Sequence, residues 1–223
     1  MADVFISYAR EDHAFVQRLH AALAARQREA WVDWQGIAPT AEWMAEILRA
    51  IDGADAAVFV LSSSWIASRV CAEELAHAAG RRKRLIPIVC APLDEDAPVP
   101  DVLARLNWVL MREGDDFDAA FERLINALAT DFEHVREHTR LVLRSAEWDA
   151  HGRDRSGLLA GSQLTDAERW LAGAAALGDP TPTPLQAQYI AASRIRLSDK
   201  TSRLRPRHVA PKRGQSHEPE VPV

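Results

Sequence analysis

The first half of the chain alternates short apolar runs with stretches in which apolar residues recur at helical spacing. Five apolar runs predict buried strands, at residues 3–8, 30–33, 56–61, 85–89 and 106–110. Between them, apolar residues recur every three or four positions and predict helices at residues 11–26, 42–51 and 65–80. Continuous apolar strands separated by helices are typical of parallel strands joined by crossover helices. The pattern therefore predicts a five-stranded parallel α/β fold with helices on both faces.

From Phe117 onward the apolar spacing is purely helical. It predicts one helix that starts at Phe117 and runs to Trp148. A capping box that begins at Thr165 predicts the start of a second helix, and Pro184 is expected to be the first residue of a third. The second half of the chain is therefore expected to be a helical extension of the α/β domain.

Residues 198–223 differ in composition from the rest of the chain. They contain six lysines and arginines, three acidic residues, four prolines and few large apolar residues. Such a segment cannot bury enough apolar surface to offset the entropy of ordering, so it is expected to be a disordered tail. We favour a solvated tail over one that contacts nucleic acid or anionic lipid. The expected organisation is an α/β domain at 1–131, a helical extension at 132–197 and this tail.

The overall composition is that of a soluble globular protein, because 48% of the 223 residues are hydrophobic, 26% are charged, and the net charge is −5. This mildly acidic charge argues against nucleic acid as a partner. The sequence has no apolar run long enough to span a bilayer and no basic signal-peptide start, so no membrane association is expected. The two cysteines, Cys71 and Cys90, cannot build a disulfide framework, which favours a cytoplasmic protein.

Common nucleotide-binding and metal-binding motifs are missing from the sequence. No G-x-G-x-x-G turn follows the first predicted strand, and no P-loop or paired-cysteine zinc spacing occurs. These absences disfavour a Rossmann oxidoreductase, a P-loop nucleotidase and a zinc module. His134, Glu137 and His138 imitate the H-x-x-E-H motif of metal-binding helices, but no third ligand is evident. A solvated helix face is the favoured interpretation, and no metal site is expected.

Polar and aromatic residues follow the predicted strands at their carboxyl ends, the edge at which parallel α/β sheets bind ligands. These residues are Ser7, Tyr8, Arg10, Asp33, Trp34, Ser62, Glu73 and Glu74. An arginine and aromatic rings beside a carboxylate suit a ligand that is cationic, aromatic and phosphate-bearing. Ser62 is interpreted as a helix cap because it lacks the G-x-S-x-G elbow of nucleophilic serines. Cys71 has no base beside it and is interpreted as a packing residue.

Several blocks of the sequence resemble one family in their order and spacing. Residues 3–12 resemble the opening box of Toll/interleukin-1 receptor (TIR) domains, in particular bacterial ones. The second strand with 37–43, the third strand, the box at 68–75 and the fourth strand resemble four further blocks of that family. The resemblance covers about residues 1–131. The segment 132–197 is similar to the helical region that follows TIR domains in bacterial multidomain proteins.

This resemblance implies a flavodoxin-like fold. In many bacterial members it also implies an NAD+ nucleosidase, which releases nicotinamide and gives ADP-ribose or a cyclic product in signalling or antiphage defence. Glu74 corresponds to the catalytic glutamate of the family. The substrate-lining positions correspond to Tyr8, Arg10 and Trp43, with Asp33 and Trp34 at the edge. A single carboxylate suffices, because nicotinamide is already cationic in NAD+ and leaves as a neutral molecule without a general acid. NAD+ is thus expected as the substrate, with no cofactor.

The resemblance leaves a second function open. Other TIR domains are catalytically silent adaptor modules that bind further TIR domains in signal transduction. Enzymatic members often carry tryptophan where this chain has Val70, and the glycine of the loop after the second strand is replaced near Thr40. These two departures favour the adaptor, whereas Glu74 and Arg10 with their aromatic neighbours favour the enzyme. Self-association through TIR–TIR contacts is expected for either function.

Overall fold

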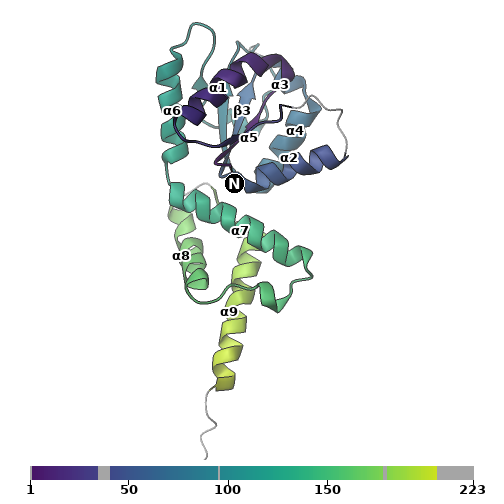
Figure 1. Cartoon of the computed structure of the whole chain (residues 1–223), viewed down its shortest axis with the longest axis vertical. Coiled ribbons are helices and arrows are strands. Elements are labelled where there is room, and N and C mark those ends of the chain that lie inside the picture. The colour runs from purple at the N-terminus through teal and green to yellow at the C-terminus, as the bar shows by residue number, and fades with distance from the viewer. Residues whose placement is uncertain (1, 35–40, 95, 178–179, 205–223) are drawn as a thin grey trace, which may run out of the picture.

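The computed structural model describes residues 2–34, 41–94, 96–177 and 180–204. Its centre is one parallel sheet (Figure 1). The strands are β1 (Val4–Ser7), β2 (Ala30–Trp31), β3 (Ala56–Leu61), β4 (Arg84–Val89) and β5 (Val109–Leu110), in the order β2-β1-β3-β4-β5. The predicted five-stranded parallel fold is confirmed. Both edge strands are shorter than predicted, since only two residues of each pair with a neighbour.

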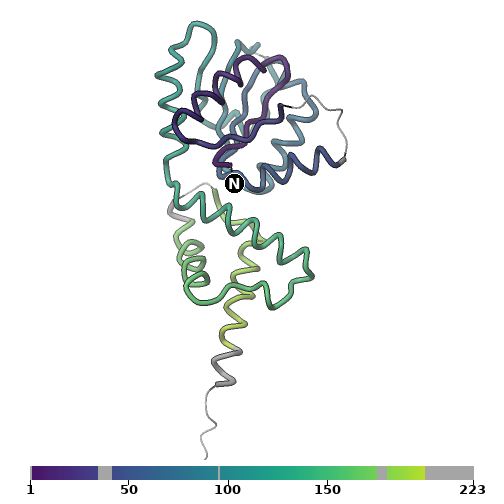
Figure 2. The backbone as a smooth tube through the Cα atoms, viewed as in Figure 1, coloured from purple at the N-terminus to yellow at the C-terminus, as the bar shows by residue number. Residues whose placement is uncertain are grey.

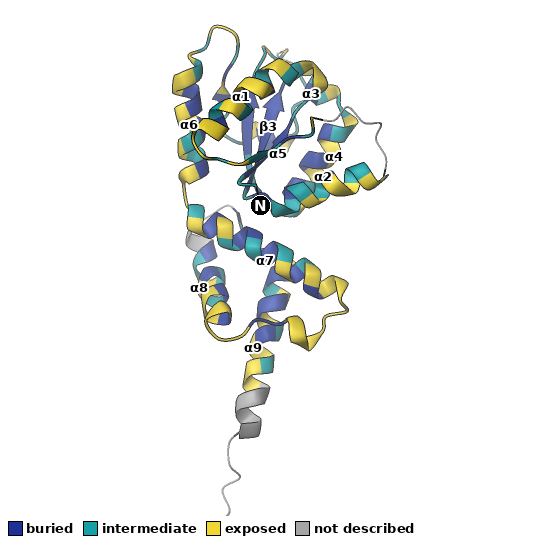
Figure 3. Cartoon of the chain, in the orientation of Figure 1, coloured by how far each residue is buried: buried dark blue, intermediate teal, exposed yellow. Residues whose placement is uncertain are grey.

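Helices cover both faces of this sheet. On one face lie α1 (His13–Ala25) and α6 (Phe117–Ala129), and on the other lie α2 (Ala41–Gly53), α4 (Arg69–Gly80) and the short α5 (Asp101–Ala104). Side chains of β3 alternate between the two faces. Val58 and Val60 pack towards α1 and α6, while Ala57 and Phe59 pack towards α2 and α4. Figure 3 shows β3 in the colour of buried residues. Burial on both faces explains why β3 is a continuous apolar run in the sequence.

The segment between β3 and β4 contains two helices, where the sequence predicted helical stretches from 65 to 80. Helix α3 (Ser63–Ala67) precedes α4, and Ser68 separates them in an extended conformation. Ser68 caps α4, since its Oγ accepts a hydrogen bond from the backbone N–H of Cys71 at 3.3 Å. Ser62 likewise caps α3 by accepting from the N–H of Trp65 at 3.1 Å, which confirms its interpretation as a capping residue.

The helical extension contains α7 (Phe132–Ala150), α8 (Ser162–Leu177) and α9 (Pro184–Leu204), packed around their own apolar core. The prediction of one helix from Phe117 to Trp148 is wrong. The chain turns between α6 and α7, where Asp131 has a left-handed φ of 49° (Figure 2). The capping box at Thr165 is also wrong, because α8 begins at Ser162 and Thr165 lies inside it. The predicted start of the last helix at Pro184 is confirmed.

The last helix extends further than the sequence predicted. Residues 198–204, expected to belong to the disordered tail, are the end of α9. These seven positions contain no proline or glycine, and the first proline after them is Pro206. The rest of the predicted tail, 205–223, lies outside the described residues. No helix in the described ranges is long and apolar enough to cross a membrane.

The interpretation of His134 and His138 as part of a solvated helix face is wrong, because both are buried. The His134 ring stacks on Trp170 of α8 at a centroid distance of 5.4 Å, and its Nε2 is hydrogen-bonded to the Pro180 carbonyl at 2.9 Å. Burial lowers the pKa of His138 to about 3, so its ring is neutral. Within the described part of the chain, no group of His, Cys, Asp and Glu side chains is suited to hold a metal.

The extension contacts the α/β domain through α7, which packs against α2. At this contact the buried Lys83 ammonium donates to the carbonyls of Asp52 and Ala54 at 2.7 and 2.8 Å, and to Thr139 Oγ1 at 3.3 Å. Thr139 thereby joins α7 to the start of β4. That 1–131 and 132–197 are separate domains stays a prediction.

Candidate functional site

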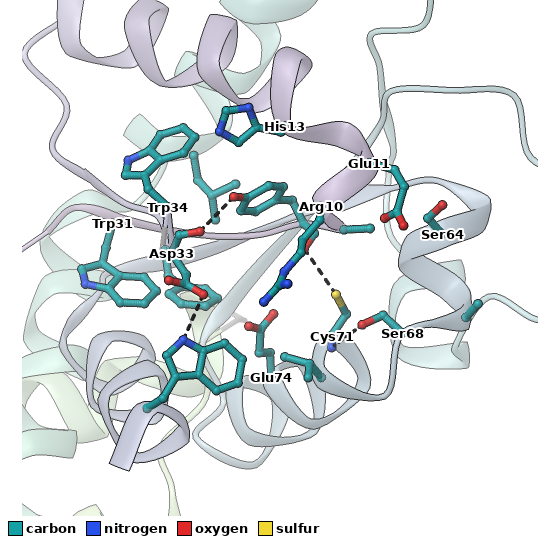
Figure 4. A pocket seen from close by; sticks show the side chains of 17 residues that line it. Arg10, Glu11, His13, Trp31, Asp33, Trp34, Ser64, Ser68, Cys71 and Glu74 are labelled. Atoms are coloured by element: carbon teal, nitrogen blue, oxygen red, sulfur yellow. Dashed lines mark hydrogen bonds between the residues drawn. The ribbon is translucent and has the colours of Figure 1, made fainter. Parts of the chain in front are cut away.

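A cavity of about 660 Å³ opens at the carboxyl ends of β1 and β2 (Figure 4). Six residues that the sequence assigned to a site lie in its wall: Tyr8, Arg10, Asp33, Trp34, Trp43 and Glu74. They come from four parts of the chain, namely the segment after β1, the segment after β2, helix α2 and helix α4. The topology brings them together because parallel strands all end at the same edge of the sheet.

Glu74 provides the buried carboxyl group of this cavity. It lies on α4, and only 6% of its surface is exposed. Ser7 at the end of β1 donates a hydrogen bond from Oγ to Glu74 Oε2 at 2.5 Å. Burial raises the pKa of Glu74 to about 7; the Ser7 hydrogen bond opposes this rise, and the charge of Asp33 adds to it. Near neutral pH the carboxyl therefore changes its charge readily.

Asp33, in the wall opposite Glu74, is hydrogen-bonded to two aromatic side chains of the cavity. Its carboxylate Oδ2 accepts a hydrogen bond from Trp43 Nε1 at 3.0 Å, and its backbone carbonyl accepts one from the Tyr8 hydroxyl at 2.8 Å. Burial, followed by the charge of Asp33, raises the pKa of Tyr8 above its usual 10. Tyr8 is therefore a neutral donor at physiological pH. These two bonds hold both aromatic rings in place beside the cavity.

Trp34 lies at the rim of the cavity, with 40% of its surface exposed. The rings of His13 and His20 from α1 meet it edge-on, at centroid distances of 5.3 and 5.4 Å. Tyr8 is tilted against it at 6.2 Å. The rim is thus an exposed indole supported by three neighbouring rings, which leaves apolar ring surface open to a ligand.

The comparison with protein families fits this arrangement. The sequence model described as the TIR domain matches residues 4–125, which contain every strand and the whole cavity wall. The chain belongs to the TIR domain family. No curated protein matches the chain.

Solved structures of TIR-containing proteins are similar to this one. The TIR domain of the Toll-related receptor TRR-2 from Hydra magnipapillata is 24% identical, covers 61% of this chain and 99% of its own, and has a TM-score of 0.46. A TIR-STING receptor from C. gigas, solved with 2′,3′-cGAMP, is 18% identical over 58% of this chain and 40% of its own, with a TM-score of 0.47. The TIR domains of the Roq1 resistosome are 22% identical over 64% of this chain and 83% of their own, with a TM-score of 0.38.

The TIR cavity also contains residues that the sequence analysis did not assign to the site, among them Glu11, His13, Trp31, Ser64 and Ser68. Trp31 is held by stacking on Phe5 at 5.3 Å. Glu11, Trp31 and Ser68 lie within the blocks that resemble the family, but the sequence analysis gave them no role at a site. They line the cavity together with His13 and Ser64 because β2, the start of α1 and the α3 region all meet at this edge of the sheet.

The sequence departs from enzymatic TIR domains at Val70 and near Thr40, and the structure describes only the first of these positions. Val70 lies in the cavity wall, so a smaller apolar side chain occupies the place of an indole. Thr40 lies outside the described residues. Trp65 does not substitute for the missing indole, because it is 2% exposed and belongs to the core.

Cys71 lies in the cavity wall but is not activated as a nucleophile. Its Sγ donates to the backbone carbonyl of Tyr8 at 3.5 Å, and burial raises its pKa to about 12. A thiol with so high a pKa carries almost no thiolate at neutral pH. This supports its interpretation as a packing residue, which links α4 to the end of β1.

Proposed function

We propose that this TIR domain cleaves the bond between nicotinamide and ribose in NAD+, giving nicotinamide and ADP-ribose or a cyclic ADP-ribose. One observation carries the proposal: Glu74 places a buried carboxyl group in a cavity whose other walls are aromatic and carry Arg10. The proposed setting is bacterial signalling or antiphage defence in the cytoplasm, with NAD+ as the substrate and no cofactor.

The size and lining of the cavity suit this substrate. About 660 Å³ lies within the range of small-molecule sites. Tyr8, Trp34 and Trp43 offer ring faces for a flat, cationic pyridinium or for a purine base. Arg10 offers the donors that recognise phosphate oxygens. NAD+ combines a cationic ring, a second base and a pyrophosphate, so each class of group in the wall has a counterpart in the substrate.

The reaction needs little acid–base chemistry. When the bond between ribose C1′ and nicotinamide N1 breaks, its electron pair stays on N1 and neutralises the pyridinium. The ribose is left as an oxocarbenium-like cation. Water then attacks C1′ and loses a proton to give ADP-ribose, or a nitrogen of the adenine attacks C1′ to give a cyclic product.

Glu74 is proposed to stabilise that cation. A carboxylate removed from water interacts strongly with a positive charge that develops beside it, and it is already in place before the reaction begins. It can act through the ribose hydroxyls and the field of its charge, or as a nucleophile at C1′. In each case the ionised form is the active one.

The adaptor function is the second candidate, and Val70 is the observation that favours it. An aliphatic side chain at this place in the wall offers no ring face to the nicotinamide. In that case the protein would bind further TIR domains without cleaving NAD+. Self-association through TIR–TIR contacts is proposed for both functions.

One experiment separates the two candidates. The purified protein is incubated with NAD+ over a wide range of protein concentrations, with and without a crowding agent, and nicotinamide is measured by chromatography. Release that increases more than in proportion to protein concentration supports an enzyme activated by self-association. No release under any of these conditions, with oligomers detected by light scattering, supports the adaptor.

A further inference from the structure

A chain of hydrogen bonds connects Glu74 in the cavity wall to two buried side chains behind it, Ser7 and Trp65. Trp65 on α3 donates from Nε1 to Ser7 Oγ at 2.9 Å, and Ser7 on β1 donates from Oγ to Glu74 Oε2 at 2.5 Å. The exposed fractions of Trp65, Ser7 and Glu74 are 2%, 1% and 6%. Trp65 and Ser7 lie behind the cavity wall, since neither belongs to the residues that line the cavity.

The direction of this chain follows from the chemistry of its members. An indole N–H can only donate, so Trp65 occupies a lone pair of Ser7 Oγ. The single proton of the Ser7 hydroxyl is then directed to Glu74. An ionised Glu74 has no proton to give, so Ser7 donates to Oε2 of the carboxylate.

The two oxygens of Glu74 have different surroundings as a result. Oε2 is held by Ser7, whereas no side chain or backbone group of the described residues donates to Oε1. Figure 4 shows the Glu74 side chain directed into the cavity, together with that of Arg10. Oε1 is the oxygen left for a ligand.

We propose that Ser7 and Trp65 are positioning residues for Glu74: together they fix Oε2, so that Oε1 is presented to the ribose and keeps its charge in a buried place. Only the catalytic part of this inference, the presentation of Oε1 to the ribose, rests on the proposed cleavage of NAD+. The hydrogen-bonded chain and its effect on the charge of Glu74 can be tested on the protein without substrate.

Trp65 is itself held in place from two sides, which makes it a fixed donor. Its backbone N–H donates to Ser62 Oγ at 3.1 Å, and Ser62 Oγ donates to Asp12 Oδ2 at 2.5 Å. Its ring meets Phe59 of β3 edge-on at 5.8 Å. The donor end of the chain therefore belongs to the core of the sheet, and a donor fixed in advance needs no rearrangement when charge develops.

The first test is a titration of Glu74 in the ligand-free protein, labelled with ¹³C at glutamate carboxyls. The signal of Glu74 is assigned by its loss in Glu74→Gln. Removing a hydrogen bond to a buried carboxylate favours the protonated form, so Ser7→Ala should raise the pKa of Glu74 by about one unit or more. Ser7→Cys keeps the size but donates more weakly, and should raise it less. Trp65→Phe removes only the outer donor and should also raise it less than Ser7→Ala.

The control is Ser145→Ala. Ser145 is equally buried, but its hydroxyl donates to the Val142 carbonyl of its own helix, α7. This variant loses a buried serine hydroxyl without contact to Glu74, so the pKa of Glu74 should stay at its wild-type value. It separates the effect of the hydrogen-bonded chain from a general loss of stability.

The second test is kinetic. In NAD+ cleavage, Ser7→Ala should lower kcat about tenfold or more with little change in KM, and should move the acidic limb of the pH profile to higher pH. An unchanged pKa of Glu74 in both Ser7→Ala and Ser7→Cys overturns the inference, whatever the activity. If NAD+ is not cleaved by the wild type while the pKa moves as expected, the proposed function fails and the positioning of Glu74 stands.

Discussion

Glu73 and Glu74 are neighbours on α4, yet only Glu74 belongs to the cavity wall. Glu74 is 6% exposed and accepts a hydrogen bond from Ser7, whereas Glu73 is exposed to solvent and lies outside the cavity. Consecutive helical side chains point about 100° apart, so one of the two had to face away. The pair provides a matched control: the same Glu→Gln substitution removes a buried charge of the cavity at position 74 and a solvated charge at position 73.

The first prediction concerns stability. The pKa of Glu74 is about 7 in the folded protein, above its ordinary value of 4.5, so the folded state holds the proton more tightly than the unfolded state. The contribution of Glu74 to stability is therefore largest below pH 4.5, falls as pH rises to about 7, and is constant above it; the loss from this group is about 3 kcal/mol. Glu74→Gln cannot ionise and should be more stable than wild type by up to that amount at pH 8.

Urea denaturation at pH 4.5, 6 and 8 measures this difference. Glu74→Gln and wild type should have similar stability at pH 4.5 and diverge as pH rises. Glu73→Gln should follow the wild-type curve at all three values, because Glu73 is solvated. A Glu74→Gln protein that is no more stable than wild type at pH 8 contradicts the buried, destabilising carboxylate.

The second prediction is the pH dependence of NAD+ cleavage. If the Glu74 carboxylate is the active form, kcat/KM should fall about tenfold for each unit below a pKa near 7. Bound NAD+ carries a cationic ring, which favours the carboxylate, so the limb of kcat should lie at lower pH than that of kcat/KM. Initial rates from pH 5 to 9 give both curves, and a kcat/KM that stays level between pH 5 and 7 argues against this role.

The sheet could be predicted from the sequence because burial on both faces makes its strands continuous apolar runs. Glu74 was found through the family box at 68–75, and its position relative to Glu73 follows from helix geometry. Neither the family box nor the helix geometry decides whether Glu74 catalyses a reaction. The roles of Ser7 and Trp65 could not be found, because their hydrogen bond joins residues 58 positions apart.

The errors in the helical extension have physical causes too. The sequence contains no signal for a helix end at the turn between α6 and α7. Thr130 and Asp131 are neither glycine nor proline, and the apolar stripe continues across them. His134 and His138 lie among charged residues in the sequence. They are buried because Trp170, from a helix more than thirty residues later, packs against both rings, stacked on His134 and tilted against His138.

The third prediction tests the departure at Val70. Val70→Trp would add an indole to the wall of the cavity, where a ring face can stack on the cationic nicotinamide. We expect KM for NAD+ to fall between about twofold and thirtyfold, as a cation–π contact of 0.5–2 kcal/mol implies. Val70→Leu, which adds volume without a ring, is the control. Equal effects of the two variants would show that volume, not stacking, matters at this position.

The fourth prediction concerns the contact between the helical extension and the TIR domain. Thr139→Val removes the Oγ1 that lies 3.3 Å from both Lys83 Nζ and the Ala54 carbonyl, and should lower the unfolding free energy by about 1–2 kcal/mol. Thr165 donates from Oγ1 to the carbonyl of Gly161, just before α8, and is exposed, so Thr165→Val should change stability by less than about 0.5 kcal/mol. Urea denaturation measures both, and equal losses would mean that the contact contributes nothing.

The most direct test of the central claim is nicotinamide release by three proteins at pH 8: wild type, Glu73→Gln and Glu74→Gln. Wild type and Glu73→Gln should cleave NAD+ at similar rates, because Glu73 lies outside the cavity. Glu74→Gln keeps the size of the side chain but not its charge, and should be slower by about a hundredfold or more. Cleavage by Glu74→Gln at the wild-type rate would contradict the account.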